Sequence, residues 1–149
     1  NRESGMNPYL LHEELQEVMQ NNVGIVRSAE LLTAGIEQLD KLKESYKEVK
    51  AAGASQFNPG WHEALAQRNM IITAEATARS ALLREESRGA HTRIDFPDER
   101  NEFLDVNVIT LKGEDGSMMV KKVNRPEPPT ELNRIANLSI EELEQEIAS

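Results

Sequence analysis

The chain has 149 residues, 38% of them hydrophobic and 4% aromatic, so it can form one domain with a core of aliphatic side chains, and an all-β fold is disfavoured. Its 26 acidic and 17 basic residues give a formal net charge of −9, which repels nucleic acid and anionic lipid surfaces. The sequence has no cysteine for a disulfide or a Cys-ligated metal centre and no stretch of the roughly 20 apolar residues that a membrane-spanning helix needs, so we expect no nucleic-acid partner and no direct membrane insertion.

The first predicted element is a helix that begins at Pro8, after a linker of residues 1–7. Proline is favoured in the first helical turn, and Leu11, Leu15 and Val18 then recur at the spacing of one helix face. A pair of asparagines and a nearby glycine then predict the end of this helix.

A second, longer amphipathic helix is predicted from residue 29. Its apolar residues recur in steps of three and four: Ala29, Leu32, Ile36, Leu39, Leu42, Tyr46 and Val49. The charged residues between them alternate in sign: Glu37, Lys41, Lys43, Glu44, Lys47 and Glu48. We interpret these charges as a solvated face and not as a binding surface.

A third helix is predicted to begin at Pro59, because Asn58 is a good N-cap residue and proline suits the first helical position. One apolar stripe of this helix consists of Trp61, Leu65, Ile72, Ala76 and Leu83, and a second beside it of Ala64, Ile71, Ala78 and Leu82. We expect the alanines to allow close helix approach and Trp61 to plug one end of the core. Short connections then favour an up-down-up three-helix bundle, similar to a spectrin repeat, over residues 8–86.

Residues 87–124 are predicted to form a structured loop followed by a small β-hairpin. Residues 87–97 have neither a helical nor a strand period, and Gly and Pro interrupt them. Apolar residues then follow a strand pattern from Leu104 to Leu111 and again from residue 118 to 123, with the turn sequence Gly-Glu-Asp-Gly between the two runs. The predicted fold is therefore mainly α.

The last segment, residues 125–149, has the composition of a Pro-rich spacer and an acidic tail. We expect residues 125–129 to be stiff and extended. From residue 125 onward the sequence has six acidic and two basic residues. Ser139 and Glu142 have the spacing of a capping box. The apolar residues after it share one helix face: Ile140, Leu143 and Ile147. The tail is therefore expected either to be disordered or to form a short helix.

No pattern in the sequence predicts a metal site or a catalytic centre. The three histidines, His12, His62 and His91, lack the spacing that would place two ligands on one helix face. The sequence also lacks the Gly-x-Ser-x-Gly motif of a nucleophile elbow and the glycine-rich loops that bind nucleotide phosphates. We therefore predict that this chain has no catalytic, cofactor-binding or metal-binding residue.

The one chemically dense segment is the loop that leaves the third helix. Its candidate interface or structural residues are Arg84, Glu86, Ser87, Arg88, His91, Arg93 and Asp95. Arginine guanidinium groups need carboxylate or carbonyl partners, so such a loop either binds an anion or joins two surfaces. We favour intramolecular or interdomain salt bridges, and proton transfer by His91 is the alternative.

Residues 84–97, with the sequence REESRGAHTRIDFP, closely resemble the Arg-x-Glu-Ser-Arg-Gly-Ala-His-x-Arg-x-Asp-x-Pro motif of the flavoprotein subunit of succinate dehydrogenase and fumarate reductase. Further upstream, Leu15-Gln16, the sequence VGIVR at 23–27 and Asn69-Met70 also resemble the C-terminal helical domain of that subunit. L-Aspartate oxidase and adenylylsulfate reductase share a similar loop, but the Ala-His-x-Arg-x-Asp form favours the succinate/fumarate branch.

The resemblance implies that this chain is a C-terminal structural domain of an FAD-dependent enzyme that interconverts succinate and fumarate and passes electrons to an iron–sulfur subunit. FAD belongs to the parent subunit in this interpretation, and this chain binds no cofactor and is inactive alone. The implied partners are the flavin-binding domain of the same subunit and the iron–sulfur subunit, in a membrane-associated complex at the cytoplasmic, inner face of the membrane.

The sequence leaves two other interpretations open. One is a free-standing helical adaptor that binds a protein partner, and the other is the C-terminal domain of an L-aspartate oxidase-type flavoprotein. If the apolar face that normally contacts a partner is exposed in the isolated chain, two copies of the chain could dimerise through it. The direction of the reaction, succinate oxidation or fumarate reduction, is not encoded in any of these residues.

Overall fold

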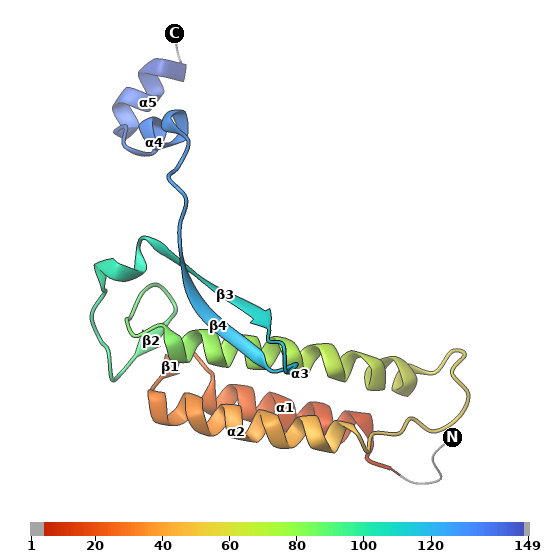
Figure 1. The fold of residues 1–149 in the computed structure, drawn as a ribbon. Helices are drawn as coiled ribbons and strands as arrows, with labels where there is room; N and C mark the ends of the chain where they lie inside the picture. The colour runs from red at the N-terminus through yellow and green to blue at the C-terminus, as the bar shows by residue number, and fades with distance from the viewer. Residues whose placement is uncertain (1–4, 148–149) are drawn as a thin grey trace.

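The computed structural model describes residues 5–147, so the first four residues of the predicted linker lie outside the described part of the chain. Three helices, α1 (Pro8–Asn22), α2 (Ala29–Tyr46) and α3 (Pro59–Leu83), lie side by side and alternate in direction (Figure 1). Each helix contacts the other two. The predicted up-down-up bundle is therefore confirmed, although α3 ends before the predicted limit at residue 86.

Side-chain caps explain why the three helices begin where the sequence predicts. The side chains of Asn7, Ser28 and Asn58 accept hydrogen bonds from backbone N–H groups in the first turns of α1, α2 and α3. Proline occupies the first position of α1 and of α3, where its missing N–H group leaves no bond unmade.

The core of the bundle is aliphatic and rich in alanine. Its buried residues are Leu11, Leu15, Val18, Val23, Leu32, Ile36, Leu39, Leu42, Ile71, Ala74, Ala78 and Ala81. Each fully buried leucine or isoleucine contributes roughly 1.5–3 kcal/mol to folding. The alanines of this set all come from α3, which lets α1 and α2 approach that helix closely.

The first of the two apolar stripes predicted for α3 is wrong as a core face. Trp61, Leu65 and Ile72 of the first predicted stripe are exposed, and Trp61 does not plug the bundle. The face that packs on α1 and α2 carries Ile71 and Ala78 of the second predicted stripe, together with Ala74, Ala81 and the buried Gln67. Hydrophobicity alone predicted burial for the large residues of the first stripe, but the structure leaves Trp61, Leu65 and Ile72 exposed.

Two details of α2 also differ from the prediction. The helix ends at Tyr46, and Val49 instead forms a parallel bridge with Met6, held by hydrogen bonds from Met6 N–H to Glu48 (2.9 Å) and from Lys50 N–H to Met6 (2.9 Å). Lys43 is not simply part of a solvated face, because its Nζ lies 2.6 Å from the buried carboxylate of Glu75 on α3. Such cross-helix partners cannot be identified from the spacing within one helix.

Two small sheets follow the bundle. The predicted hairpin is confirmed as β3 (Val106–Lys112) and β4 (Met118–Asn124), which are antiparallel and lie against α3 (Figure 1). A 3-10 turn, η1 (Asn101–Phe103), precedes it, so Leu104 ends that turn and does not begin the strand. The second sheet, in which β1 (Val26–Arg27) pairs in parallel with β2 (Thr92–Arg93), has no signal in the sequence pattern.

The C-terminal segment forms two short helices after an extended spacer at residues 125–129. The helices are α4 (Thr130–Ala136), which the sequence did not predict, and α5 (Ile140–Ile147), and Figure 1 shows both standing apart from the bundle. The capping box is confirmed, since Ser139 N–H donates to the Glu142 carboxylate (2.8 Å) and Glu142 N–H donates to the Ser139 hydroxyl (3.2 Å). Within residues 5–147, no helix is long and apolar enough to cross a membrane.

Candidate functional site

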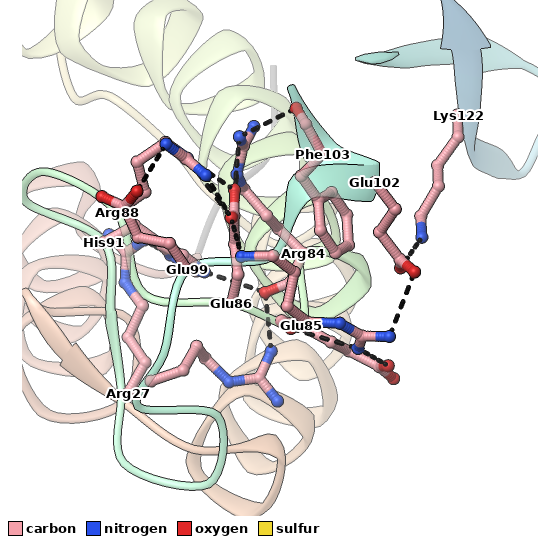
Figure 2. A network of polar contacts seen from close by, with 12 residues as sticks. Arg27, Arg84, Glu85, Glu86, Arg88, His91, Glu99, Glu102, Phe103 and Lys122 are labelled. Carbon is pink, nitrogen blue, oxygen red and sulfur yellow. Dashed lines mark hydrogen bonds and ion pairs between the residues drawn. The ribbon is translucent and has the colours of Figure 1, made fainter. Parts of the chain in front are cut away.

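The candidate site is the loop that leaves the C-terminal end of α3 and returns along β1 and η1. We use the name arginine cluster for its five guanidinium groups, those of Arg27, Arg84, Arg88, Arg93 and Arg100. Figure 2 shows part of the network of hydrogen bonds and ion pairs that joins this cluster to its carboxylate partners. All seven residues that the sequence singled out belong to this loop, and each has a partner within the chain.

Arg93 closes the C-terminal end of α3. Its side chain is 1% exposed, and its Nη1 donates to three main-chain carbonyl groups of the last turn: Ala81 (3.0 Å), Leu82 (3.1 Å) and Arg84 (3.2 Å). The last carbonyl groups of a helix have no partner within the helix, so a cation at this position both satisfies them and complements the helix dipole. Its guanidinium also lies 4.9 Å from the ring centroid of Phe96.

Asp95 joins this cap to the start of α2. Its two oxygens each accept a hydrogen bond of 2.7 Å from Arg93, and one of them also accepts from the backbone N–H of Ala29 (2.9 Å). The hydrogen bonds from Arg93 outweigh the effect of burial and hold the pKa of the Asp95 carboxyl well below its usual range. The pair Arg93–Asp95 therefore connects the last turn of α3 to the first turn of α2.

Glu86 is the centre of a second group of contacts. Its side chain is fully buried, and it accepts hydrogen bonds from Arg84 (2.8 Å) and Arg88 (3.0 Å). The backbone N–H of Arg100 donates a further bond of 2.9 Å to the same carboxylate. Burial raises the pKa of this carboxyl, but the hydrogen bonds from Arg88, Arg100 and Arg84 outweigh it and lower the pKa to about 2. Glu86 is thus a buried carboxylate that stays ionised because its partners surround it.

The two ring nitrogens of His91 are both occupied. Nδ1 lies 2.7 Å from Nη1 of Arg27, and a guanidinium can only donate, so Nδ1 accepts and Nε2–H donates to the carbonyl group of Arg84 (2.9 Å). Burial lowers the pKa of His91, and the neighbouring positive charges lower it further, while the hydrogen bond to Arg84 opposes them. A neutral imidazole with both nitrogens bonded is suited to joining β1 to the end of α3 and not to proton transfer with a substrate.

Ser87 fixes the path of the loop. Its hydroxyl accepts a hydrogen bond from the backbone N–H of Arg93 (2.8 Å) and lies 2.9 Å from the carbonyl oxygen of Phe96 and 3.2 Å from that of Arg93. The hydroxyl has a single proton and donates it to one of these carbonyl groups at a time. The Ser87 hydroxyl therefore links the start of the loop to the backbone of Arg93 and Phe96 near its end.

Phe103 connects the arginine cluster to the hairpin. Its buried ring lies under the guanidinium of Arg84 at 5.4 Å and under the ammonium of Lys122 at 3.9 Å, measured to the ring centroid. Lys122 also pairs with Glu102 at 3.2 Å (Figure 2). Arg100 pairs with the same carboxylate at 3.1 Å. The loop, η1 and β4 are therefore held as one unit.

Several important residues were not among the predicted site residues. Arg27 lies far upstream, and Arg100 and Phe103 lie beyond the motif, so only the fold brings them to the loop. The buried Glu75 on α3 pairs with Lys43 (2.6 Å) and Arg79 (2.8 Å) at a separate position between α2 and α3. Only the Arg79 pair has a sequence signal, the i, i+4 spacing on one helix.

The geometry favours a structural role for the loop over ligand binding. The buried donors and acceptors of the arginine cluster point at partners in the same chain, so its guanidinium groups are not directed into an open anion site. Among residues 5–147, no group of three or more histidine, aspartate or glutamate side chains is placed to hold a metal ion. The predicted salt bridges are therefore present within the chain.

Comparison with known proteins gives a consistent result. Residues 12–144 match the family described as fumarate reductase flavoprotein C-term. The chain is 39% identical over 102 residues to a subunit of the CoM/CoB fumarate reductase of Methanothermobacter marburgensis, a match that covers 68% of this chain and 19% of that protein. It is 37% identical over 121 residues to the succinate dehydrogenase flavoprotein subunit of Coxiella burnetii, covering 79% of this chain and 20% of that protein.

A solved structure shares the fold over nearly the whole chain. The Mycobacterium smegmatis Sdh1 complex in its apo form contains a chain that is 34% identical and superposes with a TM-score of 0.79, covering 96% of this chain and 24% of that one. This chain therefore spans about a fifth of the length of the curated relatives and a quarter of the structural neighbour.

Proposed function

This chain belongs to the fumarate reductase flavoprotein C-terminal family, and we propose that it serves as the structural C-terminal domain of an FAD-dependent flavoprotein that interconverts succinate and fumarate. The observation that carries this proposal is the arginine cluster, whose buried charges are neutralised within the chain and so hold the domain together. The names of the relatives support the succinate/fumarate chemistry of the parent protein.

We also propose that this chain contributes no site for FAD. The sequence has no glycine-rich loop for a pyrophosphate, and the arginines that could neutralise one are bonded to Glu86, Asp95 and helix carbonyl groups. We therefore place FAD, and the residues that act on the substrate, in the part of the flavoprotein that this chain does not include. On its own this chain is expected to be inactive.

The proposed partners are the flavin-binding domain of the same polypeptide and an iron–sulfur subunit that accepts the electrons. Structural neighbours from the Sdh1 complex and from a quinol–fumarate reductase support this assembly. In it, the chain would lie at the cytoplasmic, inner face of the membrane without entering the lipid.

A free-standing adaptor is the second candidate function. The exposed apolar side chains of Trp61 and Leu65 favour it, because such residues on a soluble domain mark a surface for a protein partner. The same side chains are expected in a domain that packs on the rest of a flavoprotein, so the two functions must be separated by experiment.

The test is a binding experiment between this chain and the separately produced flavin-binding part of the same protein, with and without FAD. We expect a complex and the recovery of succinate-dependent dye reduction when the two parts are combined. A flavin-binding part that is fully active without this chain, and that does not bind it, would contradict the proposal and favour the adaptor.

A further inference from the structure

Four exposed apolar residues lie around the start of α3, at one end of the bundle. We call this group the α3 end surface and define it by Tyr9 of α1, Phe57 of the α2–α3 loop, and Trp61 and Leu65 of α3. Their side chains are 46%, 93%, 40% and 51% exposed, respectively. Aromatic residues with a polar edge are characteristic of protein interfaces, where the ring is buried and the edge finds a hydrogen-bond partner.

Phe57 stands out within this surface. Its backbone has φ = 55°, in the left-handed region that residues other than glycine rarely adopt. Proline follows Asn58, and the Asn58 amide donates to the carbonyl groups of Ala52 (2.6 Å) and Ala54 (2.7 Å), which fixes the loop in this shape. The structure therefore holds a large apolar ring outward in solvent instead of allowing it to fold back onto the bundle.

Two shallow hollows flank the first turns of α3. Tyr9, Phe57, His62 and Ala66 contribute to the walls of one hollow. The other is lined by Tyr46, Lys47, Val49, Ala51, Trp61, Ala64 and Leu65. The first hollow is mostly apolar and the second is of mixed polarity, so the first is suited to aliphatic or aromatic side chains from another protein surface.

The first described residues, Gly5 and Met6, lie at the edge of this surface. Met6 pairs with Val49, which lines the second hollow, and Gly5 lines an adjoining depression with Ala51 and Gly60 at the start of α3. Because the matching family is a C-terminal one and the curated relatives are about five times as long as this chain, the rest of such a flavoprotein precedes residue 5. Polypeptide connected at this point has a high effective concentration at the α3 end surface.

We propose that the α3 end surface is the docking site of the preceding part of the same polypeptide, and that Phe57, Trp61 and Leu65 insert into an apolar face of that part. This inference rests on the proposed function, because it requires the chain to be the C-terminal domain of a longer flavoprotein. The hairpin is not part of this surface, although Met119 of β4 is also exposed.

The experiment uses the full-length flavoprotein with a specific protease site inserted among residues 1–4. After cleavage, gel filtration under dilution measures whether this chain stays bound to the preceding part. Trp61→Glu and Leu65→Glu place a charge in the surface, and Met119→Glu is the control, because Met119 is similarly exposed at a distant position. Circular dichroism and the melting temperature of each released chain verify that the variants fold.

We expect the two parts of the cleaved wild type and of Met119→Glu to remain associated on dilution. The parts of Trp61→Glu and Leu65→Glu should dissociate at protein concentrations at least tenfold higher than those at which the wild-type parts dissociate. Trp61 is the only tryptophan in this chain, and release exposes its ring to water. The tryptophan emission of the chain released from the Leu65→Glu variant should therefore be red-shifted relative to that of Trp61 in the wild-type complex. Folded Trp61→Glu and Leu65→Glu variants that bind as tightly as wild type would overturn this inference and leave the proposed function standing. Immediate separation of the wild-type parts would overturn both.

Discussion

Buried charges are the most informative single residues in this protein. Arg93 and Glu86 are among its most deeply buried large side chains, and each is surrounded by partners of opposite charge or by carbonyl and N–H groups. A charge in such a position is tolerated only when its hydrogen bonds are complete, so each of these residues depends on the geometry of several others. The motif at residues 84–97 therefore acts as one structural unit.

The shape of the Arg93 side chain should matter as much as its charge. Arg93→Lys keeps the positive charge, but an ammonium group cannot bond both oxygens of Asp95 and three helix carbonyl groups together. We expect a loss of about 2 kcal/mol in the free energy of unfolding, measured by urea denaturation. Arg134→Lys in the exposed tail is the matched control and should leave the denaturation curve unchanged. Equal behaviour of the two variants would contradict the assigned role of Arg93.

Glu86 should make the stability of the chain sensitive to acid. Its pKa falls from 4.5 to about 2 on folding, so the unfolded chain binds more protons in this range. The stability that Glu86 contributes is therefore complete above about pH 4.5 and is lost as the pH falls through 2. We expect Glu86→Gln to be less stable than wild type at pH 7, with the difference shrinking between pH 4.5 and 2. A difference that stays constant with pH would show that the ionised carboxylate is not the stabilising form.

At the scale of the elements, the caps and the apolar periods decide where helices begin, and neighbouring elements decide which face is buried. Asn7, Ser28 and Asn58 fix the three helix starts locally. The spacing within α3 predicts two apolar stripes, and only the packing of α1 and α2 decides which of them is buried. The pairing of β1 with β2 likewise joins residues that are far apart in the sequence.

The C-terminal helices α4 and α5 should be independent of the bundle. Their residues are exposed apart from the half-buried Leu138 and Leu143, and the ion pairs of Arg134 with Glu131 and Glu146 lie within this segment. Truncation after Pro129 is therefore expected to shift the melting temperature of the chain by less than about 2 °C in calorimetry. A larger loss of stability would show that the tail packs on the bundle in solution.

At the scale of the whole molecule, three parts with different sources of stability are joined together. The bundle is held by an aliphatic core, the loop and hairpin by the arginine cluster and the contacts of Phe103, and the tail by its own caps and ion pairs. The α3 end surface lies at the opposite end of α3 from the arginine cluster (Figure 1). If the isolated chain dimerises, as the sequence allows, this exposed surface is a candidate for the contact.

The sequence alone determined the local features of this protein: the starts of α1, α2 and α3, the hairpin, the capping box at Ser139, and the motif that indicates the flavoprotein family. Each of these depends on residues close together in the chain, where turn chemistry and periodicity act directly. Only the tertiary structure decided which face of α3 is buried, how Arg27 and Arg100 reach the loop, and that Trp61 is exposed. These features depend on contacts between distant segments, and such contacts exist only once the helices have packed.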